Sequence, residues 1–157
     1  MEGQMSLREH LLELLRGESA HIGLESALKD FPLAHINTRI INSPHTAWEL
    51  LEHIRICQWD IVEFSRDANH VSPDFPDGLW PAGQGSVEDW QRSVEQIRED
   101  LQAMRDMVAD ENTDLFAKIP HGDGQTILRE ALVLADHNAY HLGQIMLLRR
   151  MLENGDS

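Results

Sequence analysis

The strongest helical pattern in this chain lies in the stretch Ala131-Leu-Val-Leu-Ala-Asp-His-Asn-Ala-Tyr-His-Leu-Gly-Gln-Ile-Met-Leu-Leu148. An α-helix has about 3.6 residues per turn, so its apolar face repeats at intervals of three and four residues. In this stretch the repeat selects Leu134, His137, His141, Ile145 and Leu148. The spacing therefore predicts a long amphipathic helix that carries two histidines within its apolar face.

These two histidines lie four residues apart, which gives them a chemical as well as a structural interpretation. An imidazole inside an apolar face loses its water and needs another polar partner. Side chains at positions i and i+4 of a helix can converge on one divalent ion. His137 and His141 are thus either a metal-binding pair or two hydrogen-bonded core residues. A zincin-type peptidase is not supported, because Asn138 follows His137 where that motif requires glutamate.

The same periodicity predicts three earlier helices and no strand. The expected helices run from about residue 6 to 29 with a break or kink at Gly17, from residue 43 or 46 to about 66, and from 86 through 108. The last helix follows a turn at residues 120–124 and continues to about 153. Between the apolar positions of the third helix lie many charged side chains, for which a solvated outer face is the simplest interpretation.

Four long amphipathic helices predict an all-α fold, a four-helix bundle formed by a single domain over residues 1–157. The segment 67–85 is too long and too rich in proline and glycine for a simple turn. It also contains Phe75 and Trp80, so we expect a packed loop that walls a pocket. Its length indicates that the helix order departs from a simple up-and-down bundle.

Composition excludes several classes of function. The formal charge is −14 at pH 7, so phosphate backbones and anionic membranes would be repelled. No apolar run approaches the roughly 20 residues that span a bilayer, and the first residues lack the pattern of a signal peptide. Cys57 is the single cysteine, so no intrachain disulfide can form. A cytoplasmic location is the default expectation.

A third candidate ligand is His53, in the middle of the second predicted helix. It shares a face with Leu50, Cys57 and Phe64, so it is another imidazole on an inward surface. Taken alone, such a histidine is more often a core residue than a ligand. A bundle can nevertheless bring it against two residues of the last helix, and catalytic metal sites commonly have three protein ligands and an open position.

The segments Pro44-His-Thr-Ala-Trp-Glu-Leu-Leu-Glu-His53 and Asp136-His-Asn-Ala-Tyr-His-Leu-Gly-Gln144 resemble the paired signatures of the DinB-like (DinB/YfiT) metalloenzyme superfamily. Gln125-Thr-Ile-Leu-Arg-Glu130 also resembles that family, and the resemblance extends from the first helix to Arg150. It implies a four-helix bundle of unusual helix order. It also implies a metal site with three histidine ligands, which map onto His53, His137 and His141.

The resemblance also suggests a range of activities. Characterised members of the family include thiol-dependent transferases and isomerases, in which the metal holds a low-molecular-weight thiol as thiolate, and other relatives act as hydrolases. It therefore implies a divalent metal, zinc or nickel above all, a small-molecule substrate and a homodimer. The alternative is a non-catalytic, stress-related bundle that binds a metal or another small ligand. No catalytic residue beyond the metal ligands can be named from the sequence.

Several residues near the three histidines have both a functional and a structural interpretation. Gln144 would hydrogen-bond a bound ligand or lie between helices, and Glu49 and Asp60 would orient His53 or lie on the surface. Tyr140 would be a proton donor or a packed ring, and His45 would lie at the pocket mouth or on the surface. Cys57 would be a metal ligand, a nucleophile or an inert core residue.

Overall fold

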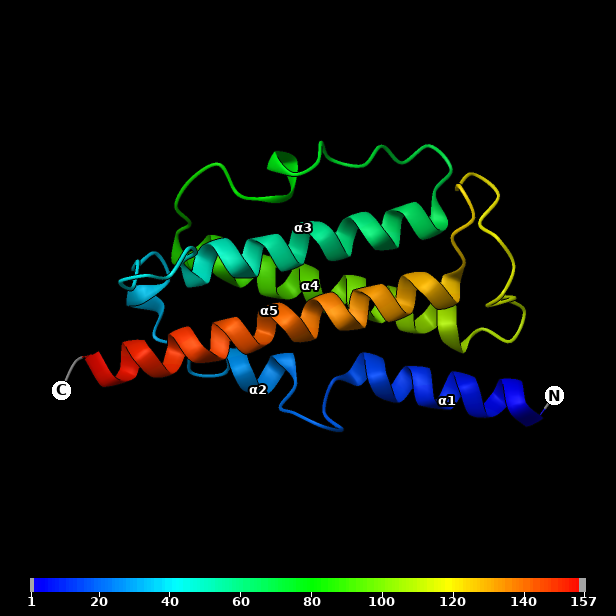
Figure 1. The fold of residues 1–157 in the computed structure, drawn as a ribbon, viewed down its shortest axis with the longest axis horizontal. Coiled ribbons are helices and arrows are strands. Elements are labelled where there is room, and N and C mark those ends of the chain that lie inside the picture. Colours follow the sequence, from blue (N-terminus) through cyan, green and yellow to red (C-terminus); the bar gives the residue numbers. More distant parts are fainter. Residues whose placement is uncertain (1, 156–157) are drawn as a thin grey trace.

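The computed structural model describes residues 2–155, and within them the chain is helical. Four long helices and one short helix are present, together with two single turns of 3-10 helix (Figure 1). Their bounds are α1 Glu2–Arg16, α2 Leu24–Leu28, η1 Leu33–His35, α3 Ala47–Arg66, η2 Asp77–Leu79, α4 Val87–Ala109 and α5 Ile127–Gly155. No strand occurs in this range, where Lys118 and Thr126 form an isolated β-bridge. The all-α fold is confirmed.

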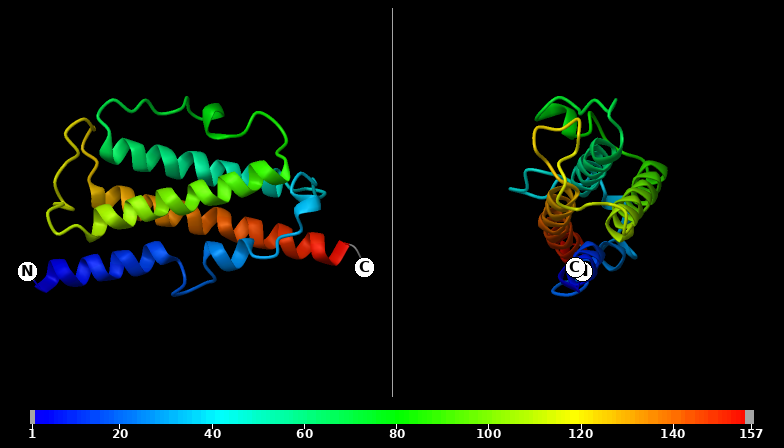
Figure 2. Two further views of the ribbon diagram at one scale, coloured as in Figure 1. Left: turned by 180° about the vertical axis from the view of Figure 1, so that it is seen from behind. Right: turned by 90° about the vertical axis from the view of Figure 1, so that its right-hand side faces the viewer.

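The helices pack as a bundle in which α3 lies on the side away from α1 and contacts both α4 and α5 (Figure 1). The α1 helix covers the other side of α4 and α5. Figure 2 shows that α3 and α4 run in the same direction, while α1 and α5 run in the opposite one. A tight turn cannot join two parallel helices, so residues 67–86 return along the whole length of α3.

The starts of α3 and α4 follow from local hydrogen bonding. Thr46 and Glu49 form a complete capping box at α3, and Ser86 and Asp89 form another at α4. Each box satisfies backbone N–H groups that have no partner inside the helix. The predicted start at Ser86 is thereby confirmed, and of the two predicted starts for α3 the structure adopts Thr46.

The first predicted helix differs most from the structure, which divides it into α1 and α2. Gly17 adopts a φ of +71°, a left-handed conformation that favours glycine and ends α1 at Arg16. The chain then runs irregularly to Leu24, where α2 begins. The expected break at Gly17 is therefore a true helix end rather than a kink.

Two apolar clusters form the core, at opposite ends of the bundle. One lies where Leu51 and Ile54 of α3 meet Ile145 of α5, and the other lies where Val62 of α3 meets Leu134 of α5. Along α3, α4 and α5 a stretch with buried polar side chains separates the two clusters, and on α5 this stretch contains both predicted histidine ligands. The fold thus places a buried polar layer midway along the bundle.

Two expectations about solvation are wrong. Asp100 on α4 was expected on the solvated face but is only 3% exposed, because it lies one turn from Ile97 and from Met104 on the inward surface. Phe75 was expected to pack within the long loop, but its side chain is 87% exposed. Within residues 2–155, none of the helices is long and apolar enough to cross a bilayer.

Candidate metal site

His53 lies in the middle of α3 and is buried with a fixed ring orientation. Its Nδ1 lies 2.7 Å from the carbonyl oxygen of Leu79, in the loop that crosses over α3. A carbonyl oxygen can only accept, so Nδ1–H is the donor and Nε2 keeps its lone pair. A carbonyl acceptor on the distal nitrogen is the usual way in which proteins orient a histidine that binds metal.

His141 on α5 is buried and held in a similar way. Its Nδ1 donates to the side-chain oxygen of Gln144 at 2.7 Å, which leaves Nε2 free. Gln144 was expected to contact a bound ligand or to lie between helices. It instead orients the neighbouring imidazole on its own helix, one turn away.

His137 brings α5 against α3 at the centre of the polar layer. Its Nε2 lies 3.1 Å from Nε2 of His53. The ring centroids of His53, His137 and His141 are separated by 4.5 to 4.9 Å, so all three predicted ligands occupy one cluster. Nδ1 of His137 is buried and has no hydrogen-bond partner.

Burial keeps these imidazoles neutral at physiological pH. Desolvation lowers the pKa of His137 to about 4, with further lowering by the charges of His141 and His53. Desolvation also lowers the pKa of His53 and of His141, against the opposing effects of Leu79 and Gln144. Neutral rings present lone pairs, which is the state that a metal requires.

The spacing of His53 and His137 fits two ligands of a tetrahedral metal ion. With metal–nitrogen bonds of about 2.0–2.1 Å, two nitrogen ligands of such an ion are about 3.3 Å apart, close to the 3.1 Å between Nε2 of His53 and Nε2 of His137. Among the described residues, ligand atoms of His53, Cys57 and His137 all lie within 4.8 Å of one another, near enough to share an ion. Cys57 is buried, and desolvation, with the charge of Asp60, raises the pKa of its thiol to about 12.

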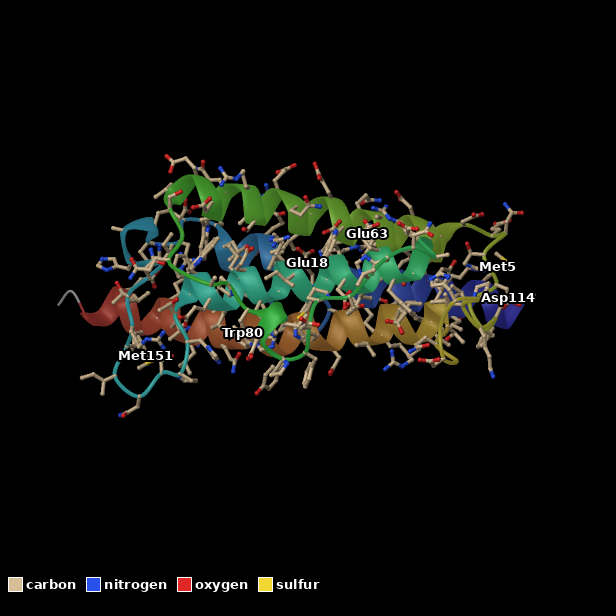
Figure 3. All side chains as sticks on the ribbon, turned by 90° about the horizontal axis from the view of Figure 1, so that it is seen from above. Met5, Glu18, Glu63, Trp80, Asp114 and Met151 are labelled. Carbon is tan, nitrogen blue, oxygen red and sulfur yellow. The ribbon has the colours of Figure 1, made fainter. Side chains whose placement is uncertain are left out.

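Trp80 covers this cluster from the crossing loop. Its ring stacks on His53 with centroids 3.8 Å apart and planes 2° apart. His45, just before α3, also stacks on Trp80, at 4.1 Å. Figure 3 looks down on the loop and shows Trp80 where the chain passes over α3 and α5. The expectation that Trp80 walls a site is met in the packing, and His45 lies beside that wall.

Two other candidates, Glu49 and Asp60, have hydrogen-bond partners outside the histidine cluster. The Glu49 carboxylate accepts from the backbone of Thr46 and from Arg39, and Asp60 pairs with His70 at 2.7 Å. Neither carboxylate contacts His53 through these bonds. Tyr140 is 66% exposed, although its ring touches the edge of His141. The functional interpretations of Glu49 and Asp60 as orienting groups for His53 are therefore not supported by these contacts.

A polar network beneath the histidines was not predicted. Gln58 is fully buried, donates to the carbonyl of Ile97 at 2.6 Å and accepts from Asn138 at 2.7 Å. These bonds tie α3 to α4 and α5 next to His137. The signal for Gln58 was available in the sequence, because it lies four residues from both Ile54 and Val62 on the inward face of α3.

Comparison with known proteins agrees with the family resemblance of the sequence. The sequence profile of the DinB superfamily matches residues 18–145, which include all three histidines. The chain belongs to the DinB superfamily. No curated protein and no solved structure matches the chain significantly.

Proposed function

We propose that this chain is a metal-dependent enzyme that acts on a small molecule, as a thiol S-transferase or a hydrolase. In this proposal His53, His137 and His141 bind one divalent ion, zinc or nickel, through their Nε2 atoms. The observation that carries the proposal is the 3.1 Å separation of Nε2 of His53 and Nε2 of His137 across two helices. Membership of the DinB superfamily supports it.

The protein groups around the site prepare it before any metal arrives. The Leu79 carbonyl and Gln144 hold two of the rings with Nε2 free, so little rotational freedom is lost on binding. Trp80 shields His53 from water, and a drier surrounding strengthens electrostatic interactions within the site.

A divalent ion bound by three neutral imidazoles would lower the pKa of a bound water or thiol and would polarise a carbonyl group. The carboxylates of Glu49 and Asp60 would not reduce that ion's charge, because they are engaged elsewhere. A low-molecular-weight thiol is the proposed co-substrate of the transferase, and water that of the hydrolase.

The alternative is a non-catalytic bundle that binds metal or another small ligand, as in a stress response. A buried histidine cluster would also suit a protein that binds a metal without catalysing a reaction. A cytoplasmic location and a homodimer stay predictions from sequence, as does the absence of nucleic-acid and membrane partners.

The deciding experiment measures the metal content of the untagged protein and then its cobalt spectrum during titration with small thiols. The proposal expects about one metal per chain, and a matched variant, His10→Ala, should behave as the wild type because His10 is exposed on α1. A thiol-dependent spectral change favours the transferase, and metal without a thiol response favours the hydrolase or the non-catalytic alternative. Absence of metal after reconstitution would remove the proposal.

A further inference from the structure

We propose that Cys57 is a fourth protein ligand of this centre, so that a small-molecule thiol enters by exchange with a thiolate of the chain. This inference rests on the proposed metal site. It concerns the one position of that site that the three histidines leave open.

The placement of Cys57 matches that of a ligand. Cys57 follows His53 by four residues on α3, and His141 follows His137 by four residues on α5. Two i, i+4 pairs therefore face each other across the helix interface, each able to present two donor atoms to one ion. The ligand atoms that lie within 4.8 Å of one another are those of His53, Cys57 and His137, and His141 adds the second member of the α5 pair.

The distances place Cys57 beside this site. The Cys57 Sγ lies 3.8 Å from Nε2 of His53 and 3.5 Å from Nδ1. A sulfur that shares an ion with Nε2 lies farther from Nδ1 than from Nε2, so ligation requires the Cys57 side chain to rotate toward Nε2. Cys57 also belongs to the group whose ligand atoms all lie within 4.8 Å of one another, together with His53 and His137.

The surroundings distinguish Cys57 from an ordinary core cysteine. Its side chain is buried in the polar layer, beside the ring of His53 and near the charge of Asp60, rather than within either apolar cluster. The hydrogen bonds of its sulfur, within the described structure, go to the two ring nitrogens of His53. A thiol that only filled space would gain more from apolar neighbours.

Ligation by Cys57 has two chemical consequences. When the Cys57 sulfur binds the metal, its S–H bond breaks, the metal–sulfur bond forms and the proton is released to the buffer. A thiolate also makes the site softer, which favours zinc or copper(I) over manganese or magnesium. When a small thiol enters, it gives its proton to the Cys57 sulfur and takes its place at the metal, so the charge of the centre is unchanged.

The test uses the cobalt-loaded full-length protein in buffer without thiols. Because Cys57 is the single cysteine, a thiolate-to-cobalt charge-transfer band in the near ultraviolet can arise only from it. We expect that band in the wild type and its loss in both Cys57→Ser and Cys57→Ala, with about one cobalt per chain retained. Adding a small thiol should restore the band in either variant and only shift it in the wild type.

Zinc competition gives a second readout. Both variants should lose zinc affinity by about tenfold or more, since outer-shell partners alone change metal affinity by about 10-fold to 100-fold. Helical circular dichroism checks that each variant folds. A wild type that binds one cobalt without the band overturns the role of Cys57 and leaves the histidine site standing. A wild type that binds no cobalt overturns both.

Discussion

Nε2 of His53 and Nε2 of His137 lie 3.1 Å apart although 84 residues separate the two histidines in the chain. Without a metal, His137 can donate Nε2–H to the lone pair of His53, but its own Nδ1 then stays buried without a partner. A metal-free site of this kind stabilises the fold less than well-packed apolar residues would. The arrangement becomes favourable when a cation accepts both lone pairs.

Zinc should therefore stabilise the folded protein. At a free zinc concentration about 100 times the dissociation constant, the free energy of unfolding should rise by about 2.7 kcal/mol. We expect His53→Ala, His137→Ala and His141→Ala each to remove most of this zinc-dependent rise in the free energy of unfolding. Denaturant unfolding with and without zinc measures it. His10→Ala should keep it, and a full zinc effect in His141→Ala would restrict the site to the other donors.

The hydrogen bond from His141 to Gln144 should tune metal affinity. Gln144→Leu keeps the size of the side chain but removes the acceptor, so zinc affinity should fall by about tenfold. Gln144→Glu retains an acceptor oxygen and adds charge, so its affinity should equal or exceed that of the wild type. Competition with a chromogenic chelator measures both, and equal affinities for the Leu and Glu variants would rule out the orienting role.

Trp80 should control access to the site. Removing its ring in Trp80→Ala exposes the face of His53 on which it stacks, so a chelator should extract cobalt about tenfold faster than from the wild type. Trp80→Phe keeps an aromatic ring over His53 and should stay close to the wild-type rate. Unchanged extraction from the Ala variant would place the route of metal exchange elsewhere.

Asp100 should make stability depend on pH. Desolvation raises the pKa of this carboxyl, and its Oδ2 is buried without a partner. The pKa of Asp100 is therefore higher in the folded protein than in the unfolded chain, where it is about 3.9. The contribution of the side chain to stability is complete below about pH 3.9 and is lost as the pH rises through the folded pKa. Asp100→Asn should thus raise the free energy of unfolding at pH 7 by about 1 kcal/mol, but not at pH 3.

The matched control for Asp100 lies on the same helix. Gln102 donates to Asp106 just as Gln96 donates to Asp100, but the Gln102–Asp106 pair is exposed. Asp106→Asn should therefore leave stability nearly unchanged at both pH values. Equal effects of the two substitutions in urea unfolding would show that burial of Asp100 is not the cause.

Gly85 should be intolerant of any side chain. A Cβ there would lie 2.4 Å from the ring of Trp48, which is itself held by a hydrogen bond to the carbonyl of Gly83. Gly85→Ala should lower the free energy of unfolding by about 1–3 kcal/mol, the cost of overpacking a core. Gly83→Ala, whose Cβ meets no atom within 4 Å, is the control, and thermal unfolding compares the two.

The sequence was most informative where structure is set by near neighbours. The starts of α3 and α4 were predictable because each capping box is complete within four residues. The inward position of His53, His137 and His141 followed from helical periodicity, and their assignment as one ligand set came from the family resemblance. The burial of Asp100 was missed because its charge was taken as the sign of a solvated residue. Its spacing of three residues from Ile97 and four from Met104 places it on the inward face.

Contacts made by the backbone or across long separations could not be read in this way. Leu79 orients His53 through its carbonyl, a group that every residue carries, so no side-chain pattern identifies it. The stack of Trp80 on His53 depends on the path of an irregular loop. The role of Gln144 was open for a related reason, since the sequence does not say which donor its amide oxygen accepts from.

The parallel direction of α3 and α4 obliges the chain to retrace the length of α3, which is about 30 Å for 20 residues. The bundle itself uses little of this path, but Leu79 and Trp80 on it complete the surroundings of His53. Length and composition can therefore change along residues 71–78 without disturbing helix packing, whereas residues 83–86 hold Trp48 and cap α4. A connection required by topology thus becomes the part of the molecule in which the cover over His53 can diverge while the scaffold stays constant.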